Sequence, residues 1–207
     1  MNGVPQFSKQ LPHLSHLKGA EERMRLIEEL TSASGAFVTT RFVRSEEGIS
    51  VHMPRLMFSM PPDDMNIRRG ALEQLALELD AHFLPAGFIH GDLNRKNIRW
   101  CGNGYVVLDF EPWLVDPVTR RMRCTFPYLH AGDFDSGMLS PETDLLGWYF
   151  FVLSQLDPTF RRPVSVAEAN RSEVRWCCAQ GTFRSVLSLA VEVIPSGLGT
   201  GTPHLDC

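Results

Sequence analysis

The strongest constraint on the fold lies near the middle of the chain, where polar residues alternate with strand-like segments. His90-Gly-Asp92 is followed, after four residues, by Asn97. A hydrophobic run, Tyr105 to Leu108, then ends at Asp109, and Gly102-Asn-Gly104 before it is typical of a tight turn between two strands. The spacing therefore predicts a polar loop, then a hairpin with a carboxylate at its end.

This segment resembles the catalytic core of the protein-kinase-like superfamily. The superfamily has a His-Arg-Asp loop with an asparagine five residues after the aspartate, then a strand and an Asp-Phe-Gly motif. The form with glycine after the histidine is similar to the branch that holds aminoglycoside, choline, RIO and Kdo-type sugar kinases. The resemblance implies an α+β, protein-kinase-like bilobal fold with a reduced amino-terminal lobe, residues 1–56. A mainly helical carboxy-terminal lobe, residues 57–207, would carry the catalytic loop and the metal-binding segment.

The resemblance also implies a reaction, which is Mg²⁺-dependent transfer of the γ-phosphate of ATP to a hydroxyl group. Such a transfer depends on alignment of the hydroxyl and on neutralisation of phosphate charge. Asp92 would orient the hydroxyl and accept its proton. Asn97 and Asp109 would bind Mg²⁺, which prefers oxygen ligands.

The nucleotide-binding residues are less well defined by the sequence. Lysine is rare here, with Lys9, Lys18 and Lys96 only. The resemblance implies a strand lysine that meets phosphate, and we expect Lys9 in this role, with Glu22 as its helix partner. Lys18, beside Gly19 at the start of a predicted helix, is the alternative. The resemblance also implies that Met53-Pro-Arg55-Leu56 is the hinge whose backbone meets adenine.

One expected motif is absent from the sequence. Only Gly3 precedes Lys9, so no glycine-rich loop covers the phosphates. This leaves open an alternative in which the chain is a pseudokinase or binding module without a complete phosphate clamp.

Hydrophobic periodicity and β-branched residues predict the elements around the catalytic segment. In the first half we expect strands at 4–11, 36–44 and 49–53 and helices at 19–33 and 71–84. In the second half we expect a long loop at 113–139, helices from 140, at 164–180 and at 182–194, and a frayed tail at 195–207.

Asp144 allows two interpretations. Ser140-Pro-Glu142 is similar to the motif that closes a kinase activation segment, and Asp144 with Gly147 resembles the helix whose aspartate holds the catalytic loop. Alternatively, Thr143 or Asp144 is simply the N-cap of its helix.

Composition restricts the partners and the compartment. The net charge of −4 favours neither nucleic acid nor an anionic membrane as a partner. The five cysteines have no metal-ligand spacing, the first residues do not resemble a signal peptide, and no apolar run is long enough to span a membrane. We therefore expect a cytoplasmic protein, with export as an effector as the alternative.

The acceptor is the least constrained feature. The Ser-Pro-Glu motif favours a protein serine or threonine, and the short chain has little room for the helical insertions of small-molecule kinases. The His-Gly-Asp form favours a small-molecule acceptor, such as a sugar or an aminoglycoside-like compound. We expect a hydroxyl-bearing protein by a small margin.

Overall fold

The computed structural model describes residues 6–11, 20–46, 48–110, 141–161 and 179–194. The predicted loop at 113–139 and the tail at 195–207 lie outside these ranges, as does all but the end of the predicted helix at 164–180. Within the described ranges, no helix is both long enough and apolar enough to cross a membrane.

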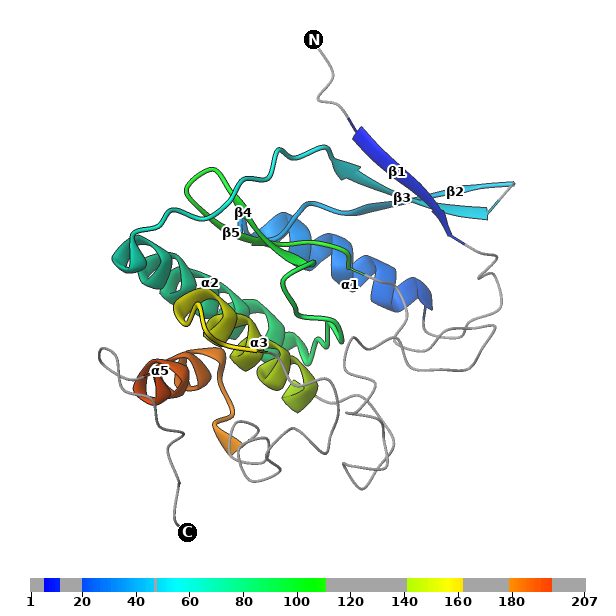
Figure 1. The fold of residues 1–207 in the computed structure, drawn as a ribbon. Helices are drawn as coiled ribbons and strands as arrows, with labels where there is room; N and C mark the ends of the chain where they lie inside the picture. Colours follow the sequence, from blue (N-terminus) through cyan, green and yellow to red (C-terminus); the bar gives the residue numbers. More distant parts are fainter. Residues whose placement is uncertain (1–5, 12–19, 47, 111–140, 162–178, 195–207) are drawn as a thin grey trace.

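The amino-terminal part is an antiparallel three-stranded sheet beside a helix (Figure 1). Strand β3 (Gly48–Pro54) lies in the centre, between β1 (Gln6–Leu11) and β2 (Arg41–Ser45). Helix α1 (Ala20–Ala33) connects β1 to β2 and buries Met24, Ile27 and Leu30, as the periodicity predicts. The sheet has a small core of its own, in which Leu11 and Val51 are buried.

The predicted strand at 36–44 divides into two parts. Only its second half joins the sheet, as β2. Its first half crosses to strand β5 (Gly104–Val107), where the Val38 N–H donates to the Val107 carbonyl at 2.8 Å and the Val107 N–H donates to the Ala36 carbonyl at 2.8 Å. Every buried backbone group needs a partner, and β5 supplies these partners for residues 36–38.

Helix α2 (Met65–Ala86) begins earlier than the periodicity predicts. The Asp64 carboxylate caps it by accepting the Asn66 N–H at 2.8 Å, but Met65 and Ile67 in its first turn are exposed. Apolar spacing therefore could not show where the helix starts. It ends at Gly87, whose φ of 57° gives a left-handed C-cap that few other residues adopt easily.

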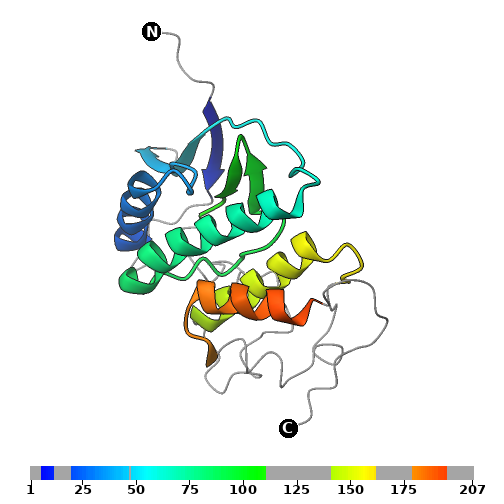
Figure 2. The same ribbon diagram turned by 90° about the vertical axis from the view of Figure 1, so that its left-hand side faces the viewer.

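The carboxy-terminal part packs helices against the β4–β5 hairpin. Strand β4 (Ile98–Cys101) pairs with β5, and helices α3 (Pro141–Leu156) and α5 (Phe183–Val193) lie against α2 (Figure 2). The largest side chains that are almost fully buried here are aromatic or aliphatic: Trp148, Tyr149, Phe83, Phe183, Leu72, Leu75 and Leu79. The main hydrophobic core is therefore in this part of the molecule.

A buried carboxylate on α3 fixes the loop that follows α2. Asp144 is 1% exposed and accepts the backbone N–H of His90 at 2.6 Å and that of Gly91 at 2.8 Å. Its side chain therefore holds the predicted catalytic loop, which confirms this role of Asp144. Burial raises the pKa of Asp144 to about 7, and the two N–H donors and Arg23 oppose that rise.

A second carboxylate joins α2 to α5. One Asp80 oxygen accepts the Phe183 N–H at 2.7 Å, in the first turn of α5, and the other is 3.0 Å from Arg184 Nε. Asp80 is largely buried, whereas Arg184 is exposed. Asp80 thus satisfies a helix-terminal donor from a neighbouring helix.

We expect Asp80→Ala to lower the free energy of unfolding by about 1–2 kcal/mol, because the Phe183 N–H loses its acceptor. Urea unfolding measures this change. Arg184→Ala is the matched control and should cost below about 1 kcal/mol, since exposed ion pairs contribute little. An equal loss in both variants would assign the effect to the ion pair.

Asp144 should make stability depend on pH in a defined direction. Its pKa is about 7 in the native state, against 3.8 ordinarily, so the native state binds this proton more tightly than the unfolded state. The stability of the parent relative to Asp144→Asn should therefore fall as pH rises from 3.8 to about 7 and stay constant above. Unfolding free energies at a series of pH values test this, and a difference that rises with pH would contradict it.

Candidate active site

The predicted catalytic loop begins where α2 ends and continues to β4 without regular structure. Gly91 has a φ of 82°, a conformation that L side chains rarely adopt. The turn at Gly91 and the two hydrogen bonds to Asp144 set the path of the backbone into Asp92. This local geometry explains why glycine follows His90.

His90 is neutral and links two segments of the site, the loop at Asp92 and the residue that follows β5, Leu108. Its ring is buried, and burial lowers its pKa to about 4. Nε2 lies 3.1 Å from the Leu108 carbonyl, and Nδ1 accepts the Asp92 N–H at 3.3 Å. Because Nδ1 is the acceptor, Nε2 carries the proton and donates to Leu108, which fixes the tautomer.

Asp92 is held by side-chain amides. The Asn97 amide donates to the Asp92 carbonyl at 3.0 Å and to Oδ2 at 2.7 Å. The Asn94 amide donates to the same carbonyl at 3.0 Å and to Oδ1 at 2.7 Å. The sequence predicts a role for Asn97 but none for Asn94, because an asparagine in a loop equally predicts an ordinary turn.

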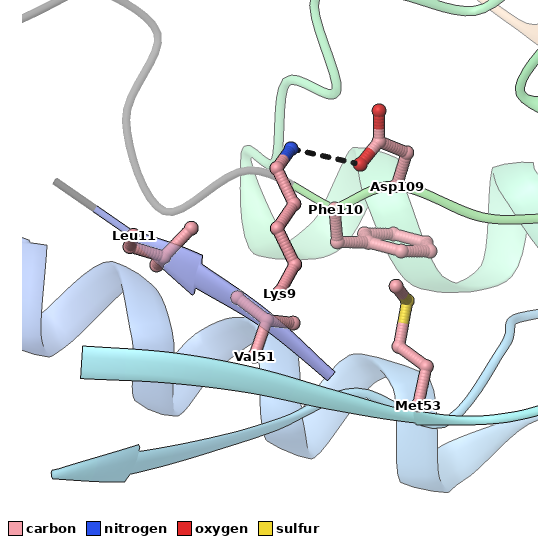
Figure 3. Close-up of a pocket in the computed structure, with 6 residues that line it drawn as sticks. All are labelled: Lys9, Leu11, Val51, Met53, Asp109 and Phe110. Carbon is pink, nitrogen blue, oxygen red and sulfur yellow. Dashed lines mark ion pairs between the residues drawn. The ribbon is translucent and has the colours of Figure 1, made fainter. Parts of the chain in front are cut away.

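Asp109 follows β5 in a strained conformation. Its φ is 64°, and no other non-glycine residue in the described ranges has a positive φ. Lys9 extends from β1 toward it, with Nζ 4.0 Å from Oδ1 (Figure 3). Backbone strain of this kind is typical of functional positions.

Phe110 anchors the residue next to Asp109. Its ring is buried and lies 5.0 Å from the His90 ring and 6.0 Å from that of Phe37, measured between centroids. The aromatic contacts hold the backbone of Asp109 against the helical core, so its carboxylate is left at the surface of the pocket.

A pocket of about 340 Å³ lies between the sheet and the catalytic loop. Such a volume is in the usual range for small-molecule sites. Its lining includes five of the predicted residues, namely Lys9, Met53, Arg55, Asn97 and Asp109. Its other six lining residues are all apolar: Phe7, Val38, Pro54, Leu56, Phe58 and Leu108.

Two predicted residues do not line this pocket. Asp92 is joined to it through its hydrogen bonds to Asn97. Glu22 is exposed in the first turn of α1, and its pairing with Lys9 stays a prediction. The structure therefore brings six of the seven predicted residues together and leaves Glu22 outside.

The residues present fit a magnesium ion bound with a nucleotide. Asn97 uses its amide N–H groups on Asp92, and among the described residues its Oδ1 accepts no hydrogen bond. Asp109 supplies a carboxylate in the same pocket, opposite the Lys9 ammonium. One amide oxygen and one carboxylate are suitable partners for Mg²⁺, which completes its shell with waters and phosphate oxygens.

Arg23 is a second residue near the site for which the sequence predicts no role. Its guanidinium donates to the Ile89 carbonyl at 2.7 Å and lies 4.6 Å from the centroid of the Phe88 ring. Burial lowers its pKa to about 10, and the charge of Asp144 opposes this. Arg23 lies one turn before Ile27 on the buried face of α1, and an arginine on that face was the available signal.

Comparisons with known proteins agree with this geometry. Residues 53–120 match the family model of APH, the phosphotransferase enzyme family. That segment contains the predicted hinge, α2, the catalytic loop and Asp109. No curated protein sequence matches the chain.

Solved structures of a protein kinase domain have a similar fold. A double-mutant form of the Mycobacterium tuberculosis PknI kinase domain is 12% identical, with a TM-score of 0.57, covering 90% of this chain and 84% of that chain. A single-mutant form is 12% identical, with a TM-score of 0.54, covering 84% of this chain and 78% of that chain. The fold is therefore kinase-like and bilobal, and residues 53–120 within it are similar to the phosphotransferase enzyme family.

Proposed function

We propose that the chain transfers the γ-phosphate of ATP to a hydroxyl acceptor in a Mg²⁺-dependent reaction. One observation carries the proposal: Asn97 holds the Asp92 carboxylate and lines the same pocket as Asp109 and Lys9. A group for the hydroxyl, groups for the metal and a cation for phosphate thus converge, as phosphoryl transfer requires.

The proposed roles follow from the chemistry of each side chain. Asp92 orients the acceptor hydroxyl and takes its proton. Asp109 and Asn97 would hold Mg²⁺, and the bound ion would neutralise charge on the phosphates. The Lys9 ammonium group contacts a phosphate and offsets its negative charge.

The base of the nucleotide is assigned to the apolar end of the pocket. Met53, near the end of β3, and Arg55, which follows that strand, line that end. We keep the boundary of the two lobes at residue 56 as part of this proposal. The small core of the sheet and the larger core of the helical part support it.

For the acceptor we propose a protein serine or threonine. The likeness to a protein kinase domain, over 90% of this chain, supports this choice. The match to the phosphotransferase family supports the alternative, a small-molecule hydroxyl such as that of a sugar. The two acceptors differ in molecular size, so an experiment separates them.

Three variants test the roles of the site residues. Asp109→Asn should weaken Mg-ATP binding and also lower the rate, because a neutral amide cannot offset the charge of the cation. Asp92→Asn should leave the affinity close to that of the parent and lower turnover by about 100-fold or more. Asn97→Ala should lie between them in affinity.

Isothermal titration of Mg-ATP into each variant measures these affinities. A larger affinity loss in Asp92→Asn than in Asp109→Asn would exchange the two roles. Thermal unfolding of the parent is the control, since a ligand that binds only the native state must raise the melting temperature. No rise with millimolar Mg-ATP would favour a binding module that does not take nucleotide.

The acceptor is tested with labelled ATP and a cell lysate. We expect label in the protein fraction, as phosphoserine or phosphothreonine, because the proposed acceptor is a protein. The Asp92→Asn variant is the control and should leave that fraction unlabelled. Label only in low-molecular-weight material would establish the small-molecule alternative.

A further inference from the structure

Each oxygen of the Asp92 carboxylate accepts a hydrogen bond from a different side-chain amide. Asn97 donates to Oδ2 and Asn94 donates to Oδ1, both at 2.7 Å. Both amides also donate to the Asp92 carbonyl, each at 3.0 Å. Two donors on opposite oxygens define the plane of the carboxylate, which one donor alone would leave free to rotate.

The orientation of the Asn94 amide is determined by its surroundings. Its Oδ1 accepts the Lys96 N–H at 2.7 Å, so its NH₂ group must be the end that faces Asp92. The side chain is 5% exposed, which keeps water from competing for these bonds. A flipped amide would place an oxygen against the carboxylate and leave the Lys96 N–H without this acceptor.

We propose that Asn94 is a positioning residue, whose amide fixes the Asp92 carboxylate in the orientation that phosphoryl transfer needs. This inference rests on the proposed role of Asp92. Asn94 acts through Asp92, and Asn97 supplies the second half of the same amide clamp. Small errors in the placement of such a group are costly, because the rate depends on alignment.

The competing explanation is a purely structural role, in which Asn94 Oδ1 stabilises the turn by accepting the Lys96 N–H. Two substitutions separate the roles. Asn94→Asp keeps an acceptor for the Lys96 N–H but replaces the donor with an anion facing Asp92. Asn94→Ala removes both the acceptor and the donor.

We expect Asn94→Ala to lower turnover by about 100-fold with an unchanged affinity for Mg-ATP. Asn94→Asp should lose at least as much, since like charges repel. The measurement is ADP release from Mg-ATP, with titration for affinity. Asn103→Asp, an exposed residue of the β4–β5 turn, is the matched control and should behave like the parent. Near-parent turnover in Asn94→Asp would establish the purely structural role and overturn the proposal.

A second measurement separates this inference from the proposed function. The Asn94 side-chain amide protons should exchange slowly with solvent in the parent, and Asp92→Ala should accelerate that exchange by removing their acceptor. NMR detects the exchange without any turnover. If the parent releases no ADP, the proposed function fails. The exchange result then tests by itself whether the Asn94 amide is hydrogen-bonded to Asp92. An exchange rate that Asp92→Ala leaves unchanged would overturn the clamp itself.

Discussion

The geometry of the site depends on one buried carboxylate. Residues 88–97 have no regular structure, so their buried N–H groups need acceptors from elsewhere in the molecule. Asp144 accepts two consecutive N–H groups of this loop and belongs to α3, whose Trp148 is fully buried and donates to the Phe183 carbonyl at 2.9 Å. The loop is therefore attached to the best-packed part of the molecule. Burial of a carboxylate raises its pKa, and two hydrogen bonds and a nearby arginine offset part of that cost.

The candidate site contains a fixed part and an exposed part. Asp92 is held by buried asparagines, and their positions are set by short hydrogen bonds within the loop. Lys9 and Asp109 are 44% and 42% exposed, and their charges lie 4.0 Å apart, a geometry that contributes little binding energy between them. A ligand entering the pocket can therefore displace the Lys9–Asp109 contact at low cost. The group proposed to orient the acceptor stays fixed while this happens, as preorganisation requires.

Much of this arrangement could be predicted from the sequence, because the spacing of Asp92, Asn97 and Asp109 constrains three residues at once. Asn94 could not be identified, since its role appears only when the neighbouring carboxylate is in place. The same holds for Arg23, whose partner Ile89 is 66 positions away in the chain. Local composition likewise predicts a strand at 36–44 without showing that its two halves pair with different partners. For Arg23 and for residues 36–38, what the sequence lacks is the identity of a partner that is distant in the chain.

The division of the core has a consequence for the amino-terminal sheet. The sheet buries little beyond Leu11 and Val51, and residues 36–38 join it to β5 through backbone hydrogen bonds. Phe37 within that joint is buried, with its ring centroid 5.3 Å from that of Phe83 in α2. One end of the joint therefore belongs to the helical core, whereas β1 and Lys9 have only the small core beneath them. Hydrophobic burial sets local stability, so the sheet should open more readily than the helices. A nucleotide that contacts both Met53 on the sheet and Asp109 on the helical part would oppose this opening. Nucleotide binding and opening of the sheet would thus be coupled, because the sheet and the helices have separate cores.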